Sequence, residues 1–196
     1  MSPSDEFISA LQRYRPYLSE EQFAALLAES EQVAPSAVRL NLLMAQIPSG
    51  ERLTYLSQKY GWRTKTLPFS DDSLQILDAL VSPSQTQEFL LGQYYLQDAA
   101  SILPVSLFSP ADKPLLKLDM AASPGGKTTQ MIDQALDRDF VIANDSAASR
   151  LSALRTVLQT WGTANYAITN FPGERWGEWY PQTFDQILLD APCSME

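Results

Sequence analysis

The chain has 196 residues, is 45% apolar and carries a formal net charge of −9. A chain of this size can bury one core of ordinary size and hold a small appendage. The sequence contains one cysteine and no histidine. These counts exclude an internal disulfide, a zinc site of the usual kind and a Ser-His-Asp triad. Acid-base chemistry would fall to Asp, Glu, Lys or Tyr, and we expect no metal.

The chain lacks both an apolar run long enough to span a membrane and the basic and apolar regions of a signal peptide near Met1. We therefore expect a cytoplasmic protein with no membrane partner. The acidic balance also argues against nonspecific nucleic-acid binding, which needs a basic surplus to neutralise phosphates.

The charge is unevenly distributed along the chain. Residues 1–65 carry seven basic and seven acidic side chains, whereas residues 66–196 carry seven basic and 16 acidic ones. Residues 39–65 contain five basic residues and a single acidic one, Glu51. This basic strip consists of Arg39, Arg52, Lys59, Arg63 and Lys65. The strip is either a solvated surface or a set of contacts to RNA phosphates, for which Arg39, Arg63 and Lys65 are our candidates.

The first third of the chain predicts a small α+β module. Residues 5–30 predict helices, with a capping-box pattern at residues 19–22, and Pro35 ends this segment. Residues 38–42 alternate like a strand, residues 50–60 predict a helix with Gly61 at its C′ position, and residues 62–67 predict a strand. Prolines, aspartates and serines in residues 68–84 indicate a linker, and residues 85–108 a largely helical segment. We expect an appendage over residues 1–80 and a second domain over 81–196.

The second part alternates apolar runs with amphipathic stretches. Strands are predicted over 115–119, 140–144, 166–169 and 184–189, and helices over 126–136 and 146–161. This alternation is typical of an α/β fold with a doubly wound parallel sheet. Ligands of such folds bind at the carboxyl ends of the strands.

A glycine-rich turn lies at such a strand end. The small residues Ala121, Ala122, Gly125 and Gly126 let backbone amides approach a phosphate or carboxylate at a helix start. A P-loop would need glycine at position 121, so residues 126–128 match that motif only in part. Asp145 follows the next strand, where a carboxylate can bind both ribose hydroxyls or cap the next helix.

Two segments, Asp119-Met-Ala-Ala-Ser-Pro-Gly-Gly-Lys-Thr128 and Asp190-Ala-Pro-Cys193, resemble the signature segments of the RNA cytosine-5 methyltransferases of the Sun family, the RsmB/RsmF-like enzymes. Residues 34–41 resemble that family's RNA-binding appendage, and residues 94–98 the segment that precedes its cofactor motif. The resemblance implies a Rossmann-like methyltransferase fold, S-adenosylmethionine as cofactor, and ribosomal or transfer RNA as substrate.

The resemblance also implies roles for particular residues. The turn Ala121-Ala122-Ser123-Pro124-Gly125-Gly126-Lys127 would hold the methionine part and the ribose, Asp145 the ribose hydroxyls, and Asp190 would lie beside the target base. In relatives an acidic residue near the adenine precedes the glycine at the position of Gly173. Here Pro172 stands in its place, so adenine recognition would depend on other groups, such as Asn170 or a backbone amide.

Cytosine C5 is a poor nucleophile, and a thiolate adding at C6 turns the ring into an enamine that attacks a methyl donor. The resemblance implies that the cysteine of the Asp-Ala-Pro-Cys segment, Cys193, assists release, while a second cysteine in a later Thr-Cys motif forms the covalent bond. This sequence holds only Cys193. We therefore expect a C-terminally truncated chain that holds the first half of the methyltransferase sheet and transfers no methyl group alone, unless Cys193 is itself the nucleophile. The alternatives are a noncatalytic RNA- or cofactor-binding remnant and, less favoured, a P-loop phosphotransferase.

Overall fold

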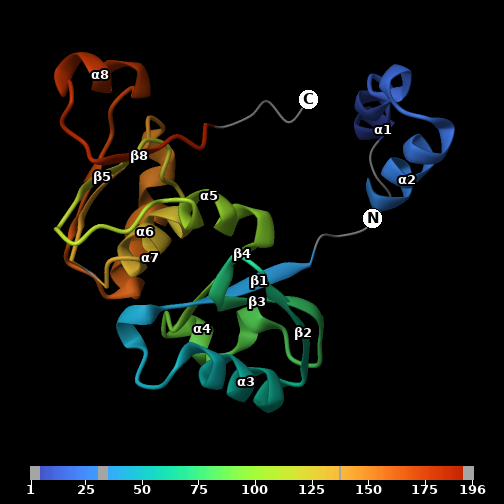
Figure 1. The fold of residues 1–196 in the computed structure, drawn as a ribbon, viewed down its shortest axis with the longest axis horizontal. Helices are drawn as coiled ribbons and strands as arrows, with labels where there is room; N and C mark the ends of the chain where they lie inside the picture. Colours follow the sequence, from blue (N-terminus) through green and yellow to red (C-terminus); the bar gives the residue numbers. More distant parts are fainter. Residues whose placement is uncertain (1–4, 31–34, 137, 192–196) are drawn as a thin grey trace. The chain divides into compact units, whose positions relative to one another are not determined.

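The computed structural model describes residues 5–30, 35–136 and 138–191, and the chain divides into two compact units. Of the described residues, 5–30 belong to the first unit, and 35–136 and 138–191 belong to the second. In the first unit, α1 (Asp5–Gln12) and α2 (Glu20–Ser30) confirm the helices predicted over residues 5–30 (Figure 1). The capping box is confirmed as well, because the Ser19 amide donates to Gln22 Oε1 at 2.9 Å and the Gln22 amide donates to Ser19 Oγ at 3.2 Å.

The second unit contains an antiparallel sheet of four strands in the order β2-β3-β1-β4 (Figure 1). These strands are β1 (Ser36–Leu40), β2 (Trp62–Leu67), β3 (Ser70–Ala79) and β4 (Tyr94–Asp98). Helix α3 (Ser49–Tyr60) buries Leu53 and Leu56 in a core shared with this sheet. Gly61 ends α3 in the left-handed conformation at φ 64°, as its predicted C′ position requires.

Two predictions for this region are wrong. The expected linker over residues 68–84 contains β3, which pairs with β1 on one side and β2 on the other. The expected helical segment over residues 85–108 contains β4, flanked by the short helices α4 (Gln87–Leu90) and α5 (Leu103–Ser106). Pairing with β1 decides both outcomes, because Val38 stands opposite Leu74 of β3 and Leu96 of β4. The first sheet thus takes its fourth strand from beyond residue 80, and the proposed domain boundary there stays a prediction.

A second, parallel sheet has the strand order β7-β6-β5-β8. It consists of β5 (Leu116–Asp119), β6 (Phe140–Asn144), β7 (Tyr166–Thr169) and β8 (Gln186–Leu188). Helices α6 (Gly126–Asp133), α7 (Leu151–Trp161) and α8 (Trp176–Trp179) connect these strands. The predicted alternation of parallel strands and helices, and with it the α/β fold class, is confirmed.

Short 3-10 helices complete the described secondary structure. They occupy Arg15–Tyr17, Leu42–Met44, Pro83–Gln85, Ala99–Ile102, Ala148–Arg150 and Gly173–Arg175. No helix in the part of the chain that the structure describes has the length and apolar character needed to cross a membrane.

The order of the second sheet decides where a ligand can bind. From β5 the chain moves to β6 and then β7 on one side, and β8 returns to the other side of β5. Since β5–α6–β6 and β6–α7–β7 are successive crossovers in one direction, α6 and α7 cover the same face. The carboxyl ends of β5 and β8 therefore flank the point where the direction reverses, which is the usual ligand position in this class of sheet.

Candidate functional site

The turn after β5 is held in place by its neighbours in the sheet. The Met120 amide donates to the Leu188 carbonyl of β8 at 2.9 Å, and the Ala122 amide donates to the Asn144 carbonyl of β6 at 2.7 Å. Gly125 then caps α6 at φ 117°, a conformation that side chains rarely adopt. The helix thus begins at Gly126, with its free amides at the carboxyl edge of the sheet.

A cavity of about 250 Å³ opens beside this turn. It is lined by Tyr95, Leu96, Gln97, Ser101, Ala121, Ala122, Ser123, Pro124, Gly126, Lys127 and Asp190. Strand β4 of the first sheet therefore forms one wall and the glycine turn another. A Cβ at Gly126 would lie 2.7 Å from Tyr95 Cε1 and 2.8 Å from Gln97 Oε1, so a larger residue here would displace these two side chains.

The two sequence segments meet at this cavity. Lys127 Nζ lies 2.7 Å from Asp190 Oδ2, although the two residues are 63 positions apart. The Lys127 side chain is 18% exposed and that of Asp190 is 55% exposed. A cation and an anion, each partly accessible, thus line one cavity, an arrangement suited to a zwitterionic ligand.

Asp119, at the end of β5, was not a predicted site residue. Its carboxyl group is buried and accepts a hydrogen bond from Thr128 Oγ1 at 2.7 Å. Burial raises the pKa of Asp119 to about 6, against the lowering effect of the Thr128 and Ala121 hydrogen bonds. Its second oxygen, Oδ1, is buried without a hydrogen-bond partner in the described part of the chain. The signal available in the sequence was its position directly before the turn at the end of a strand.

Asp145 contacts the turn but does not line the cavity. Its Oδ2 accepts the Ser123 amide at 3.2 Å, its Oδ1 accepts the Ala147 amide at 3.0 Å, and Arg150 Nη1 is 3.6 Å away. The residue is 2% exposed. It therefore holds the turn to the end of β6, and the ribose contact stays a prediction.

The remaining predicted residues are distributed as follows. Gly125 is buried and faces α7, where a Cβ would lie 3.0 Å from Val157 Cγ1. Asn170 donates from Nδ2 to the Asp145 carbonyl at 2.6 Å, and Pro172 precedes a 3-10 helix. Cys193 lies outside the described residues.

The basic strip does not form one surface. Arg63 and Lys65 are exposed on β2 and stay candidates for RNA contact. The prediction for Arg39 is wrong, because its side chain has no exposed surface and pairs with the buried Asp133. A guanidinium in this position cannot reach a phosphate, and a buried cation requires such a partner.

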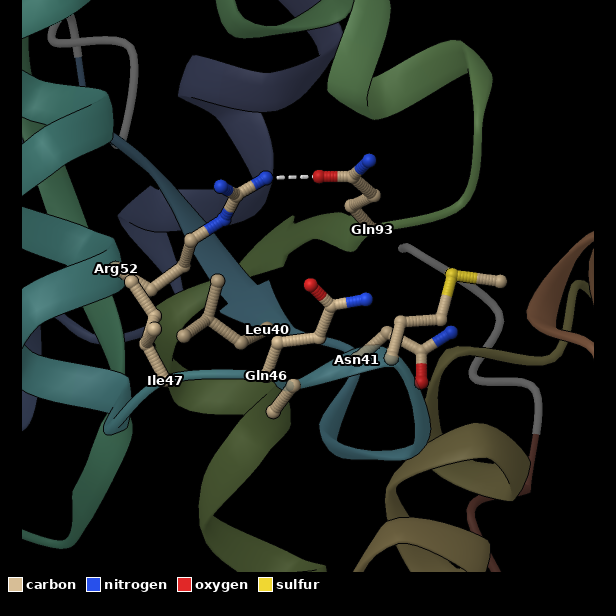
Figure 2. A pocket seen from close by; sticks show the side chains of 8 residues that line it. Leu40, Asn41, Gln46, Ile47, Arg52 and Gln93 are labelled. Carbon is tan, nitrogen blue, oxygen red and sulfur yellow. Dashed lines mark hydrogen bonds between the residues drawn. The ribbon is translucent and has the colours of Figure 1, made fainter.

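Arg52, from the same strip, lines a second cavity of about 430 Å³ beside the first sheet. Figure 2 shows its guanidinium donating across the cavity to the side chain of Gln93, with Asn41 and Gln46 on the adjoining loop. Among the described residues that line it, none has an acidic side chain. This cavity can therefore accept polar or anionic groups, but it lies apart from the glycine turn and Asp190.

Comparison with known proteins gives a consistent result. Residues 105–196 match the protein-family model described as 16S rRNA methyltransferase RsmB/F. The chain is 36% identical over 196 residues to ribosomal RNA small subunit methyltransferase F of Pectobacterium atrosepticum, covering 97% of this chain and 39% of that protein. It is 37% identical to the protein of the same name from Erwinia tasmaniensis, covering 97% and 40%. The chain thus spans about 40% of the length of these curated relatives.

Solved structures agree on the fold. A methyltransferase homolog from Pyrococcus horikoshii superposes with a TM-score of 0.80 at 28% identity, covering 98% of this chain and 64% of that one. The crystal structure of NSun6 from Pyrococcus horikoshii with SFG gives a TM-score of 0.77 at 17% identity, covering 93% and 70%, and this likeness concerns the fold alone.

Proposed function

The chain belongs to the RsmB/F methyltransferase family, and on that premise we propose that the cavity beside the β5–α6 turn binds S-adenosylmethionine. The observation that carries this proposal is the meeting of the turn, Lys127 and Asp190 around one cavity. Gly126 packs closely against Tyr95 and Gln97, which line the same cavity. The donors and acceptors present fit the methionine part of that cofactor, which carries one ammonium and one carboxylate.

When bound, S-adenosylmethionine supplies an electrophilic methyl group. The chain's own residues bind and orient it. The free amides at the start of α6 and Lys127 hold the carboxylate, while Asp190, which lines the same cavity, holds the ammonium. Asp145 holds the ribose hydroxyls, and doing so requires it to share oxygens that already accept the Ser123 and Ala147 amides.

The reaction we propose is methylation of cytosine C5 in ribosomal RNA. Family membership supports methyl transfer to ribosomal RNA. The choice of C5 is supported by the Asp190-Ala-Pro-Cys193 segment, which places a thiol three residues beyond the cavity's acidic wall. Cys193 assists release of the methylated base, or forms the covalent bond to C6 itself if no second cysteine takes part.

A binding experiment tests the cofactor assignment. Calorimetry with S-adenosylhomocysteine and its 2′-deoxy analogue should show that the wild-type protein binds the ribose form more tightly. Asp145→Ala should weaken binding of the ribose form about tenfold to a hundredfold, because a charged hydrogen-bonding group worth about 1.5–3 kcal/mol is lost. The same substitution should leave the deoxy form less affected. An equal loss for both ligands would show that Asp145 only supports the turn.

We further propose that exposed basic residues of the first sheet contact RNA phosphates. Each neutral replacement, Arg63→Gln or Lys65→Gln, should weaken binding to a ribosomal RNA fragment and reduce the slope of log K against log salt by about 0.9. Filter binding at several salt concentrations measures both quantities. Arg39 should not be used as a further probe, since it is buried. If the salt dependence of RNA binding were unchanged in both variants, Arg63 and Lys65 would be solvated surface residues that do not contact RNA.

Methyl transfer itself separates the enzyme from a noncatalytic remnant. Labelled S-adenosylmethionine should transfer its methyl group to ribosomal RNA in the presence of the full-length protein, with the product identified as 5-methylcytosine by nucleoside analysis. Binding of both ligands without turnover by the full-length protein would favour a noncatalytic role. Protection by ATP with no effect of S-adenosylhomocysteine on melting would favour the phosphotransferase alternative, which the comparisons do not favour.

A further inference from the structure

Arg39 is a fully buried cation in β1, and all its polar side-chain contacts lie in another part of the fold. It belongs to the first sheet, yet its guanidinium reaches helix α6, which follows the glycine turn of the second sheet. Burying a charge is costly unless it is paired and hydrogen-bonded. The contacts it makes there indicate what this buried charge achieves.

The guanidinium contacts both ends of α6. Its Nη1 pairs with Asp133, the last residue of the helix, while its Nη2 donates to the carbonyl of Gly126, the first residue, at 3.0 Å. Nη2 also donates to Thr129 Oγ1 at 2.6 Å. Trp161 completes the arrangement, with its ring centroid 5.0 Å from the guanidinium carbon and its Nε1 donating to Asp133 Oδ1 at 3.0 Å.

The contact with the Gly126 carbonyl acts on the cavity through covalent geometry. The carbonyl of Gly126 and the amide N–H of Lys127 belong to one planar peptide unit and point in opposite directions. In a helix the carbonyl points toward the carboxyl end and the N–H toward the amino end. The hydrogen bond from Arg39 to the Gly126 carbonyl therefore also fixes the direction of the Lys127 N–H. This N–H is one of the free amides at the start of α6. Gly126 and Lys127 both line the cavity.

We propose that Arg39 is a positioning residue of the cofactor site, which holds the first peptide unit of α6 so that its amide faces the amino-acid end of the bound cofactor. The inference rests on the proposed function for the identity of the ligand. It gives the first sheet a role in cofactor binding that is separate from RNA contact. An apolar pair at positions 39 and 133 would fill the same space but could not hold the Gly126 carbonyl.

Two variants separate positioning from packing. Arg39→Lys keeps a charge for Asp133, but one ammonium lacks the fork needed to reach Gly126 and Asp133 together. The double variant Arg39→Met with Asp133→Leu replaces a buried ion pair by apolar groups, a change that is often neutral or stabilising. As a control, Lys59→Met with Glu88→Leu removes a partly buried ion pair, 2.8 Å long, whose residues belong to α3 and α4 and do not line the cavity.

Calorimetry with two ligands gives the first readout. S-adenosylhomocysteine contains the amino-acid part, whereas 5′-methylthioadenosine lacks it. The double variant should bind S-adenosylhomocysteine about tenfold more weakly, the loss expected for one misdirected hydrogen bond, and bind 5′-methylthioadenosine with unchanged affinity. Arg39→Lys should show a smaller loss of the same kind, and the control pair none. Equal weakening of both ligands, or wild-type affinity in the double variant, would overturn the proposal.

Hydrogen exchange of the ligand-free protein gives a second readout that does not depend on the cofactor. The amides of residues 126–133 should exchange faster in both Arg39 variants than in the wild type and the control, while β6 and α7 stay protected. Unchanged exchange in residues 126–133 would refute the positioning role. If the wild-type protein bound neither ligand, the cofactor assignment would fail, and exchange alone would still decide whether Arg39 holds this helix.

Discussion

At the scale of single residues, the buried carboxyl of Asp119 makes stability depend on pH. Its pKa is raised from 3.8 to about 6 because burial outweighs the hydrogen bonds from Thr128 and Ala121. A carboxyl whose pKa is higher in the folded than in the unfolded state binds its proton more tightly when folded. Its contribution is therefore fully present below about pH 4 and is lost as the pH rises through about 6.

Asp119→Asn should remove this dependence, because the amide has a similar shape and does not titrate. The free energy of unfolding of the variant relative to wild type should rise by roughly 3 kcal/mol between pH 4 and pH 7, from a shift of about two pKa units. Denaturant titrations at several pH values measure the difference. Asp112→Asn, at an exposed position, serves as the control substitution. A pH-independent offset for Asp119→Asn would contradict the buried titration.

At the scale of secondary-structure elements, Gly92 links the first sheet to α7. It lies before β4 at φ 70°, and a Cβ there would stand 2.4 Å from the backbone carbonyl oxygen of Thr160. The backbone oxygen cannot move aside as a flexible side chain could. Gly92→Ala should therefore lower the free energy of unfolding by about 2 kcal/mol or more, from left-handed strain and displacement of α7.

Gly50 provides the matched substitution for this test. It lies in the first turn of α3 with no atom within 4 Å of a Cβ, so Gly50→Ala should leave stability unchanged or raise it slightly. Thermal and denaturant unfolding of both variants measure the contrast. A Gly92→Ala protein as stable as Gly50→Ala would show that the approach of β4 to α7 relaxes at little cost.

At the scale of the whole molecule, the described part of the second sheet leaves β8 paired with β5 alone. Beside the buried Leu188, Ile187 is 52% exposed and Leu189 is 63% exposed. An exposed apolar edge of this kind favours pairing with other chains. Ile187→Lys should therefore reduce self-association of the 196-residue chain, as measured by sedimentation velocity across a range of concentrations.

Leu80→Lys is the appropriate comparison, because Leu80 is 89% exposed and lies outside the second sheet. It adds the same charge to the molecule without touching the β8 edge. If the edge drives association, Ile187→Lys should act and Leu80→Lys should not. Equal effects from both substitutions would trace the association to net charge instead.

The sequence by itself determined the features that depend on local patterns. The capping box before α2, the glycine after α3 and the alternation of the second sheet were all predictable, since each depends on neighbouring residues or on a repeating apolar face. The same patterns located the glycine turn and the segment carrying Asp190, which the sheet brings together at one cavity.

The features that depend on contacts between residues far apart in the sequence were decided only by the tertiary structure. Strands β3 and β4 were missed because their turn-forming and polar residues read locally as linker or helix, and pairing with β1 overrides that preference. Arg39 was read as an exposed cation because its partner Asp133 lies 94 positions away. A charge pattern in the sequence does not distinguish a solvated side chain from one that folding pairs with a distant counter-ion. For this reason Arg39 was predicted to contact RNA, whereas the structure buries it against α6, beside the candidate site.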